Sequence, residues 1–336
     1  MSANASRSSQ AFSTAFIPDD ERVRAWENHN AETLIALRCD ARAAGHFQAQ
    51  EDNLELGGVH LARVRGTAHV VRRSAELIEQ RPTSSLAIYV SLRGDALFQQ
   101  AGRRQVIHPG DLLVCDADGQ FVRGFGQGLD ELAIRVDRSV LPDEAYSAAL
   151  GGPLIVRRSQ NNPYGRAIAR LVGGSLGRPT ITAPDEQTLI DLLSALAAQD
   201  MARPQLVHRA LACAYAEERL RDPRLSAPEI ATAVGISVRQ LTRVFAAVGT
   251  TLPRHILKRR LDLAYALLTG PDAGTLVTAT VAKMCGIHSV SHFSQDFRSR
   301  FGVSPGELRR SAVLDDRPLG ERSRSRAVVA STTPSR

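Results

Sequence analysis

A motif that occurs twice near the C-terminus limits the folds open to this chain more than any other feature. Gly235 in the first copy and Gly286 in the second each follow a short run of small and apolar residues. Apolar residues then return at helical spacing, namely Leu241 and Phe245 in the first copy and Phe293 and Phe297 in the second. Each copy predicts a helix, a tight glycine turn and a second helix. Such a helix-turn-helix places its second helix, here called the reading helix, in the major groove of DNA.

The positive charge of the chain is concentrated in the part that carries this repeat. The net charge is +7; residues 205–336 hold 20 Lys and Arg against 11 Asp and Glu, whereas residues 1–204 hold 22 against 24. An excess of this kind fits a domain that binds DNA phosphates, and it fits an ordinary solvated surface equally well. With 336 residues, the chain is long enough for two domains with separate cores.

Signals for metal binding, export and membrane insertion are missing from the sequence. The cysteines are scattered singly, as Cys39, Cys115, Cys213 and Cys285. Their spacing argues against a zinc site and fits a reducing compartment. The N-terminus lacks the charged and apolar regions of a signal peptide, and no apolar run reaches about 18 residues. We therefore expect a cytoplasmic protein with no membrane partner.

The N-terminal part predicts a β-rich domain with flanking helices. Residues 1–15 are rich in Ser and Ala and predict a disordered tail. A helix is expected over residues 19–38. Seven short apolar runs then end in turn residues and predict a small sandwich or barrel within residues 58–137. These runs are 59–65, 86–92, 96–100, 103–107, 111–115, 120–124 and 129–136.

Two helices are expected within residues 163–201, one over 163–176 and one over 184–201. The second carries an apolar stripe at helical spacing, formed by Leu189, Leu192, Leu193 and Leu196. Such a stripe packs either against the sheet of the same chain or against a second copy in a dimer. Residues 16–203 are thus interpreted as one sensing and dimerisation domain.

Residues 205–311 predict an all-helical domain, followed by a disordered tail over 312–336. The first helix-turn-helix is expected at about 226–247 and the second at about 278–301, joined by a long helix over 253–269. Capping boxes and glycine turns mark the helix ends, and Ser237 and Ser289 are expected to cap the two reading helices. The long helix could hold the two reading helices at a fixed separation.

The reading helices leave a defined set of side chains on the face opposite their apolar anchors. Arginine can bind guanine through two hydrogen bonds, glutamine can bind adenine, and threonine or valine can contact a thymine methyl group. The expected base contacts are Arg239, Thr242 and Arg243 in the first unit and Val290, Ser291, Ser294 and Gln295 in the second. The expected contacts to the DNA backbone are Ser237, Ser289, His292, Arg298 and Arg300. Because its face carries less charge, the second reading helix is expected to contribute less affinity.

The stretch from Gly286 to Pro305 closely resembles the signature of the AraC/XylS family of bacterial transcription regulators, and the resemblance extends over about 205–311. It implies two helix-turn-helix motifs in neighbouring major-groove segments on one face of DNA, with the seven residues above facing the bases. The sequence departs from the family pattern at four positions of the second unit, namely Thr278, Thr280, Ile287 and Gln295. These departures bear on how strongly the second unit binds.

The N-terminal part resembles the cupin-like effector domain of many members of that family. The resemblance rests on the segments 91–95, 98–103 and 108–112. It implies a small-molecule inducer bound inside the barrel and dimerisation through the flanking helices. The residues that would bind the inducer cannot be identified from the sequence.

Catalytic residues, metal ions and cofactors are not expected. Metal-binding cupins carry a His-x-His pair followed by a glutamate, whereas His46, His60, His69 and His108 stand alone. The sequence has no nucleophile elbow, phosphate loop or dinucleotide fingerprint.

Together these patterns predict an α+β protein of two domains, with a cupin-like barrel or sandwich at the N-terminus and an all-α domain of two helix-turn-helix motifs at the C-terminus. The expected function is sequence-specific transcription regulation, as an activator that responds to a small-molecule effector. The expected partners are double-stranded promoter DNA, RNA polymerase, the effector and a second copy in a homodimer. Two alternatives stay open: a cupin-type enzyme fused to a DNA-binding module, and a regulator that uses the barrel only to dimerise.

Overall fold

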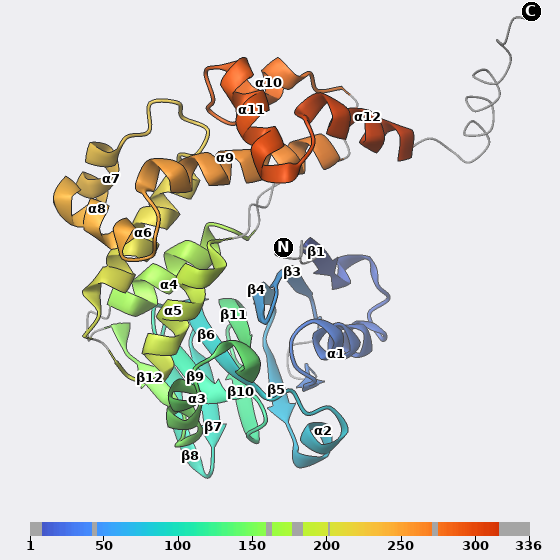
Figure 1. Ribbon diagram of the computed structural model, residues 1–336. Helices are drawn as coiled ribbons and strands as arrows, with labels where there is room; N and C mark the ends of the chain where they lie inside the picture. The colour runs from blue at the N-terminus through green and yellow to red at the C-terminus, as the bar shows by residue number, and fades with distance from the viewer. Residues whose placement is uncertain are drawn as a thin grey trace, which may run out of the picture. The chain divides into compact units, whose positions relative to one another are not determined.

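A computed structural model describes residues 9–41, 46–158, 163–176, 184–200, 202–270 and 275–315. The chain divides into two compact units (Figure 1). The first, called the sensing unit, comprises Met1–Glu218 and Ile230–Val248. The second, called the C-terminal unit, comprises Arg219–Glu229 and Gly249–Arg336.

Two antiparallel sheets form the N-terminal part of the sensing unit. The larger sheet contains, in spatial order, β1 (Ser9–Ser13), β3 (Ala49–Leu56), β4 (Val59–Gly66), β11 (Leu129–Asp137), β6 (Ser85–Arg93), β9 (Leu112–Asp116) and β12 (Leu154–Val156). The smaller sheet contains β2 (Arg38–Asp40), β5 (His69–Arg73), β10 (Phe121–Phe125), β7 (Ala96–Gln100) and β8 (Arg103–Ile107). Within the described residues the two sheets do not close into one barrel, so the predicted sandwich is the form that the structure adopts.

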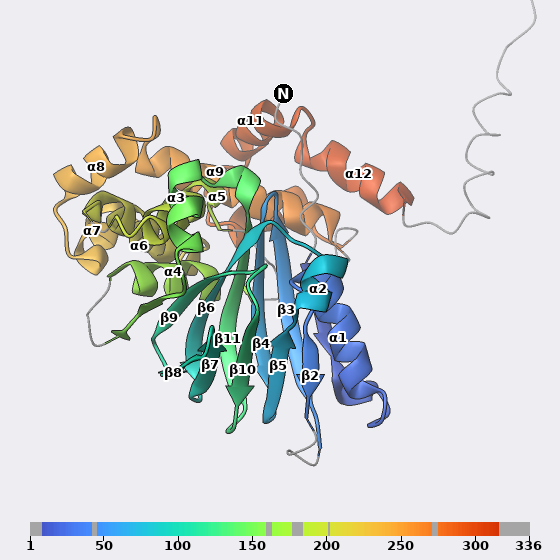
Figure 2. The same ribbon diagram turned by 90° about the horizontal axis from the view of Figure 1, so that it is seen from below.

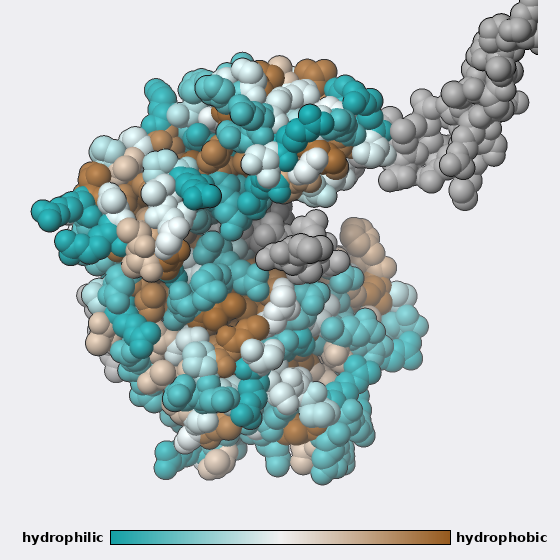
Figure 3. Space-filling view, viewed as in Figure 1, coloured by the Kyte–Doolittle hydropathy of each residue, from teal (hydrophilic) through white to brown (hydrophobic). Residues whose placement is uncertain are grey.

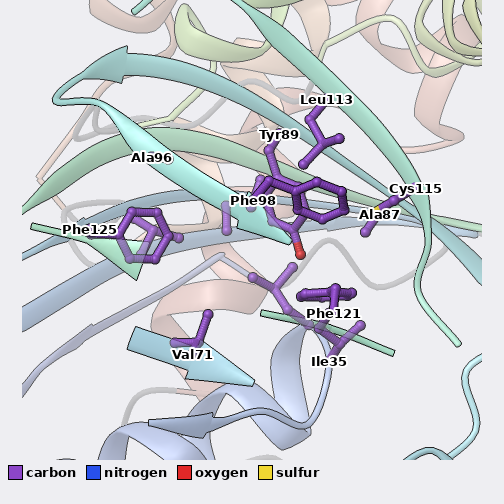
Figure 4. Close-up of a cluster of buried hydrophobic side chains, with 14 of the residues drawn as sticks. Ile35, Val71, Ala87, Tyr89, Ala96, Phe98, Leu113, Cys115, Phe121 and Phe125 are labelled. Atoms are coloured by element: carbon purple, nitrogen blue, oxygen red, sulfur yellow. The ribbon is translucent and has the colours of Figure 1, made fainter. Parts of the chain in front are cut away.

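The main core lies between the two sheets. Alternate residues of the larger sheet, such as Ala87 and Tyr89 on β6, join Val71, Phe121 and Phe125 of the smaller sheet in one buried cluster. Figure 4 shows these side chains gathered between strands of both sheets. β6 is buried on both of its faces from Ser85 to Ser91, because helices cover the other side of the larger sheet.

Helices complete the sensing unit around the sheets. They are α1 (Arg22–Thr33), α2 (Ala75–Gln80), α3 (Asp143–Leu150), α4 (Pro163–Gly173), α5 (Glu186–Ala197), α6 (Pro204–Glu218) and α8 (Val238–Ala246), with 3-10 turns at Thr14–Phe16 and Arg138–Val140. α1 lies beside β2 (Figure 2), where the Glu27 carboxylate accepts a hydrogen bond from the backbone N–H of Cys39 at 2.7 Å. α3 packs on β9, and α4 packs on β11.

α6 connects the sheets to the first reading helix. It packs against α4 and α5 on one side and against α8 on the other. Two ion pairs hold it there: Arg170 of α4 donates to both carboxylate oxygens of Glu218 at 2.9 Å, and Arg209 of α6 pairs with Asp191 of α5. The division into compact units therefore does not follow the boundary predicted at 203–205, because these contacts join α6 to the helices before it.

The C-terminal unit is built on one long helix, α9 (Leu252–Thr269). α10 (Thr278–Met284), α11 (Val290–Phe301) and α12 (Pro305–Asp315) pack against it. α7 (Ala227–Val234), the first helix of the first helix-turn-helix, spans the sequence boundary between the two units. The two predicted glycine turns are confirmed, since Gly235 has a φ of 78° and Gly286 a φ of 71°.

The structure corrects the predicted strands and tails in several places. Residues 9–13 belong to a stretch predicted to be disordered, but they form β1 because β3 offers them a partner edge. Residues 305–315 form α12, which extends past the predicted start of the C-terminal tail at 312. Residues 14 and 15, also predicted to be disordered, belong to the 3-10 turn Thr14–Phe16. The other residues of both predicted tails, 1–8 and 316–336, lie outside the described residues. The strands missed by the sequence prediction are β1, β2, β3, β5 and β12.

The leucine stripe of the expected 184–201 helix packs within the chain. Leu189, Leu192, Leu193 and Leu196 of α5 are all fully buried. Of the two interpretations left open by the sequence, the structure supports packing within the chain, because a stripe without exposed surface offers nothing to a second copy. The main partners of α5 are the helices α3, α4 and α6 and not the sheet that the sequence analysis expected. Among the described residues, no helix is both long and apolar enough to cross a membrane.

Replacing Gly286 by alanine should destabilise the C-terminal unit. A Cβ atom at Gly286 would lie 3.0 Å from the carbonyl oxygens of Leu220 and Arg221, in a backbone conformation that L-residues avoid. We expect Gly286→Ala to lower the free energy of unfolding by at least about 2 kcal/mol, as strain and overpacking add. The measurement is urea unfolding of the full chain followed by circular dichroism.

Gly302→Ala is the matched control. Gly302 also has a positive φ, of 78°, but a Cβ atom there meets nothing within 4 Å. Gly302→Ala should lower the free energy of unfolding by only about 1 kcal/mol, the cost of the backbone conformation alone. Equal losses in the two variants would contradict the close approach at Gly286.

Candidate functional site

The first reading helix, α8, is held by three buried anchors and a capped N-terminus. Leu241, Val244 and Phe245 are all buried. The Ser237 hydroxyl accepts a hydrogen bond from the backbone N–H of Gln240 at 3.1 Å, as the predicted cap requires. Since the anchors occupy one face, the direction of the opposite face is fixed.

That opposite face carries the three residues predicted to contact bases, and all three are exposed. The guanidinium groups of Arg239 and Arg243 have no hydrogen bond and no ion pair among the residues that the structure describes. Both guanidinium groups are therefore free to bind base edges or phosphates. Thr242 donates its hydroxyl proton to the carbonyl oxygen of Val238 at 3.0 Å, which leaves its oxygen an acceptor and its methyl group exposed. The first turn also exposes Val238, an apolar side chain suited to a thymine methyl group.

The second reading helix, α11, is anchored by aromatic packing. Phe293 and Phe297 are fully buried and lie edge to face at 5.6 Å between ring centroids. Tyr265 of α9 stacks on Phe297 and tilts against Phe301. The helix ends at Gly302, which adopts the left-handed conformation typical of a helix C-terminus.

The face of α11 opposite these rings is polar but carries little charge. Val290, Ser291 and Gln295 are exposed, and Ser294 is half-buried. Ser294 donates to the carbonyl oxygen of Val290 at 3.0 Å, in the same arrangement as Thr242 on α8. The structure thus leaves all four predicted base contacts of this helix within reach of a ligand.

Three of the residues predicted to contact the DNA backbone lie at the starts of the reading helices. Ser237 and Ser289 cap α8 and α11, and His292 is exposed on the first turn of α11, with its backbone N–H bonded to Ser289. A helix N-terminus carries a partial positive charge and unpaired N–H groups, both of which favour a phosphate.

Arg298 and Arg300, predicted as phosphate contacts, have partners inside the C-terminal unit. Arg300 donates twice to one carboxylate oxygen of Asp262 on α9, at 3.0 and 2.6 Å. Arg259 approaches the other oxygen of Asp262 at 3.5 Å. Arg298 pairs at 3.0 Å with Glu307, and the backbone N–H of Ser304 helps to lower the pKa of that carboxyl. The contact between Arg300 and Asp262 could not be predicted from the sequence, because the two residues lie 38 positions apart.

The surface around the reading helices is mostly hydrophilic. Figure 3 shows single apolar residues among polar ones over α8 and over α10 to α12. No group of three or more His, Cys, Asp or Glu within the described ranges is placed to hold a metal ion. His108, one of the isolated histidines, lies in a turn and pairs with Asp95 at 3.0 Å.

A second candidate site is a small cavity between the two sheets of the sensing unit. Its volume is about 40 Å³, and α1 contributes one wall. Aromatic side chains line it, among them Trp26, Tyr89 and Phe125. Arg123 and Glu131 also line it and are both buried, although the sequence analysis singled out neither of them.

Comparison with known proteins matches both parts of the chain to established families. Residues 230–311 match the helix-turn-helix domain family, and residues 26–222 match the AraC-binding-like domain family. The transcriptional activator NphR of Rhodococcus sp is 28% identical over 304 residues, which are 83% of this chain and 88% of NphR. The transcriptional activator RhrA of Rhizobium meliloti (strain 1021) is 36% identical over 97 residues, 29% of this chain and 31% of RhrA. Among solved structures, the AraC-like transcriptional activator CuxR aligns with a TM-score of 0.43 and 18% identity, over 78% of this chain and 96% of that chain.

Removing the free guanidinium of Arg243 should reduce sequence discrimination. We expect Arg243→Ala to cost about 1–3 kcal/mol at one base position and to leave the ranking of the other positions unchanged. The measurement is fluorescence anisotropy with a set of duplexes that differ at single base pairs. Arg103→Ala, which removes an exposed arginine from β8, is the control and should change neither affinity nor specificity. A uniform loss over all duplexes with Arg243→Ala would show a phosphate contact instead.

Removing Arg300 should first affect stability. Asp262 is 6% exposed and would keep only the longer contact to Arg259, so we expect Arg300→Ala to lower the free energy of unfolding by about 1–3 kcal/mol. Arg298→Ala breaks an exposed pair and should cost at most about 1 kcal/mol. Urea unfolding of both variants measures the difference. An unchanged free energy of unfolding in Arg300→Ala would contradict a structural role and favour the predicted contact of Arg300 to the DNA backbone.

Proposed function

Because the chain belongs to the AraC/XylS family of DNA-binding transcription regulators, we propose that α8 and α11 enter two neighbouring major-groove segments of a promoter. The observation that carries this proposal is the exposure of both predicted base-reading faces opposite buried anchors. α9 lies between the two reading helices in chain order and has 18 residues, or about 27 Å at 1.5 Å per residue. We propose that the two half-sites lie about one DNA turn (~34 Å) apart.

The two reading helices are proposed to contribute unequally. α8 offers two free guanidinium groups at Arg239 and Arg243, which suit bidentate recognition of guanine. α11 offers an amide at Gln295 together with hydroxyl and methyl groups, which suit adenine and thymine. We expect α8 to supply most of the salt-dependent affinity, since each phosphate neutralised by a cation releases counterions.

The sensing unit is proposed to bind a small-molecule effector in the cavity between its sheets. An effector that binds one conformation better shifts the population toward it. α4 packs on the larger sheet, α6 packs on α4, and α8 packs on α6, so these contacts form a continuous route within one unit. We propose that the effector acts on the first reading helix through this route.

The remaining assignments follow from the relatives. NphR and RhrA are named transcriptional activators, and we propose activation through RNA polymerase for this chain as well. A homodimer in the cytoplasm would bring four reading helices to paired sites and raise avidity. We propose binding rather than catalysis. The alternative of a cupin-type enzyme predicts stoichiometric iron or manganese in the purified protein, which elemental analysis measures.

Selection of duplexes from a random pool by the full chain tests the proposed function. We expect the enriched sequences to share two conserved blocks and to bind at least ~10³-fold more tightly than a scrambled duplex of equal composition. The same selection with a double variant, Arg239→Ala with Arg243→Ala, should lose the block read by α8 and keep the other. Failure of the full chain to enrich any sequence would refute sequence-specific binding.

A further inference from the structure

The cavity of the sensing unit contains a buried ion pair that packing alone does not explain. The guanidinium of Arg123 on β10 donates to both carboxylate oxygens of Glu131 on β11, at 2.8 and 2.7 Å. Arg123 also lies 3.8 Å above the centre of the Tyr89 ring. These groups sit between two sheets in a core that is otherwise mainly apolar.

Such a pair adds little to stability, because desolvation of two charges offsets their attraction. Replacing buried ion pairs by apolar residues of similar volume is often neutral or stabilising. Apolar residues already fill the neighbouring positions, and the chain could complete the core with them. A pair kept on the wall of a cavity therefore points to recognition of something that enters it.

The charges around the cavity are already balanced. Arg123 has Glu131 as its partner, and Arg135 lies 3.5 Å from the carboxylate of Asp137. Burial lowers the pKa of His69, so its ring is neutral at physiological pH. An occupant with a net charge would add an uncompensated charge to a buried site, which is unfavourable. The cavity therefore favours an uncharged occupant.

Two donors on the wall form no hydrogen bond with the described residues, the Nε–H groups of Arg123 and Arg135. The Nε of Arg135 has the carboxylate of Asp137 3.5 Å away, so Arg123 carries the donor with no acceptor nearby. The Nε–H of Arg123 is buried, and no described residue accepts a hydrogen bond from it. A buried donor without a partner costs free energy that an occupant with an acceptor atom recovers. The His69 ring donates through Nδ1 to the carbonyl oxygen of Thr67 at 2.7 Å, which leaves its Nε2 an acceptor. His69 therefore does not compete with Arg123 for an acceptor atom of the occupant.

We propose that this cavity binds an uncharged, mainly apolar molecule of about the size of one ring, whose single hydrogen-bond acceptor binds Arg123. The inference rests on the proposed function, since it names the chemical class of the effector. The cavity of about 40 Å³ is smaller than the ~150 Å³ that holds a benzene ring in a protein core, so binding must move lining side chains. Trp26 and Leu34 come from α1 and the residue after it, so this wall is not a strand of either sheet. Single hydrogen bonds join it to the sheets, such as the one that Arg135 of β11 donates to the carbonyl oxygen of Leu34 at 2.7 Å.

Four probes of equal ring size test the proposal on the full chain. They are benzamide, which is neutral with an acceptor, toluene, which is neutral without one, benzoate and benzylamine. Titration calorimetry should give benzamide the lowest Kd, about fivefold below toluene and at least ~tenfold below either charged probe. Preferred binding of benzoate or benzylamine, equal binding of toluene and benzamide, or no binding of any probe would overturn the proposal.

A pair of isosteric variants places the site. Glu131→Gln leaves the charge of Arg123 uncompensated, so benzoate should gain at least ~tenfold over benzamide relative to the unmodified chain. Asp130→Asn removes the adjacent carboxylate, which pairs with Arg63 and does not line the cavity, and should leave the order of the probes unchanged. An unchanged order in Glu131→Gln would place the ligand elsewhere. If that variant does not fold by circular dichroism, the probe series on the unmodified chain still decides.

The same samples separate this inference from the proposed function. A chain that enriches a DNA sequence but fails the probe series keeps its function as a regulator and loses only the effector class. If the chain binds benzamide but enriches no DNA sequence, the ligand site in the cavity is supported and the proposed function as a transcription regulator is refuted.

Discussion

Burial of one apolar face on each short reading helix is the constraint on which the rest of the structure depends. α8 has 9 residues and α11 has 12, and helices of this length are marginal in water without tertiary packing. Phe245 on α8, and Phe293 and Phe297 on α11, supply that packing by being buried. Because each anchor set fixes how its helix is rotated, it also fixes which side chains point outward. The positions of a few buried rings thus decide which side chains the two reading helices expose.

Charged residues serve three different purposes, and their surroundings distinguish them. Arg239 and Arg243 are exposed without a partner in the described residues, so their charge is available to DNA. Arg300 is tied to Asp262 and joins α11 to α9. Arg123 is buried with Glu131 on a cavity wall, where its charge is balanced and one N–H stays unpaired. The role of each arginine therefore depends on its burial and on its hydrogen-bond partners, and not on the residue type alone.

The sequence predicted the helix-turn-helix units closely, because local signals define them. Glycines at 235 and 286 adopt the expected left-handed turns, and the serine caps at 237 and 289 form as expected. Prediction failed where partners are distant in sequence. β1 forms only because β3 accepts it, and the short strands β2 and β12 exist only as edges of sheets. The Arg300–Asp262 and Arg123–Glu131 pairs were missed for the same reason, since only the fold brings their partners together. The periodicity of apolar residues does not predict which charged residues become buried.

Hydroxyl-radical footprinting of the full chain on a selected duplex tests the central claim most directly. Two reading helices on one chain predict two protected segments on the same face of the DNA, about one helical turn (~10 base pairs) apart. Loss of both guanidinium groups on α8 should remove one of these segments and spare the other. Protection of a single short segment by the unmodified chain, or of two segments on opposite faces, would contradict the account.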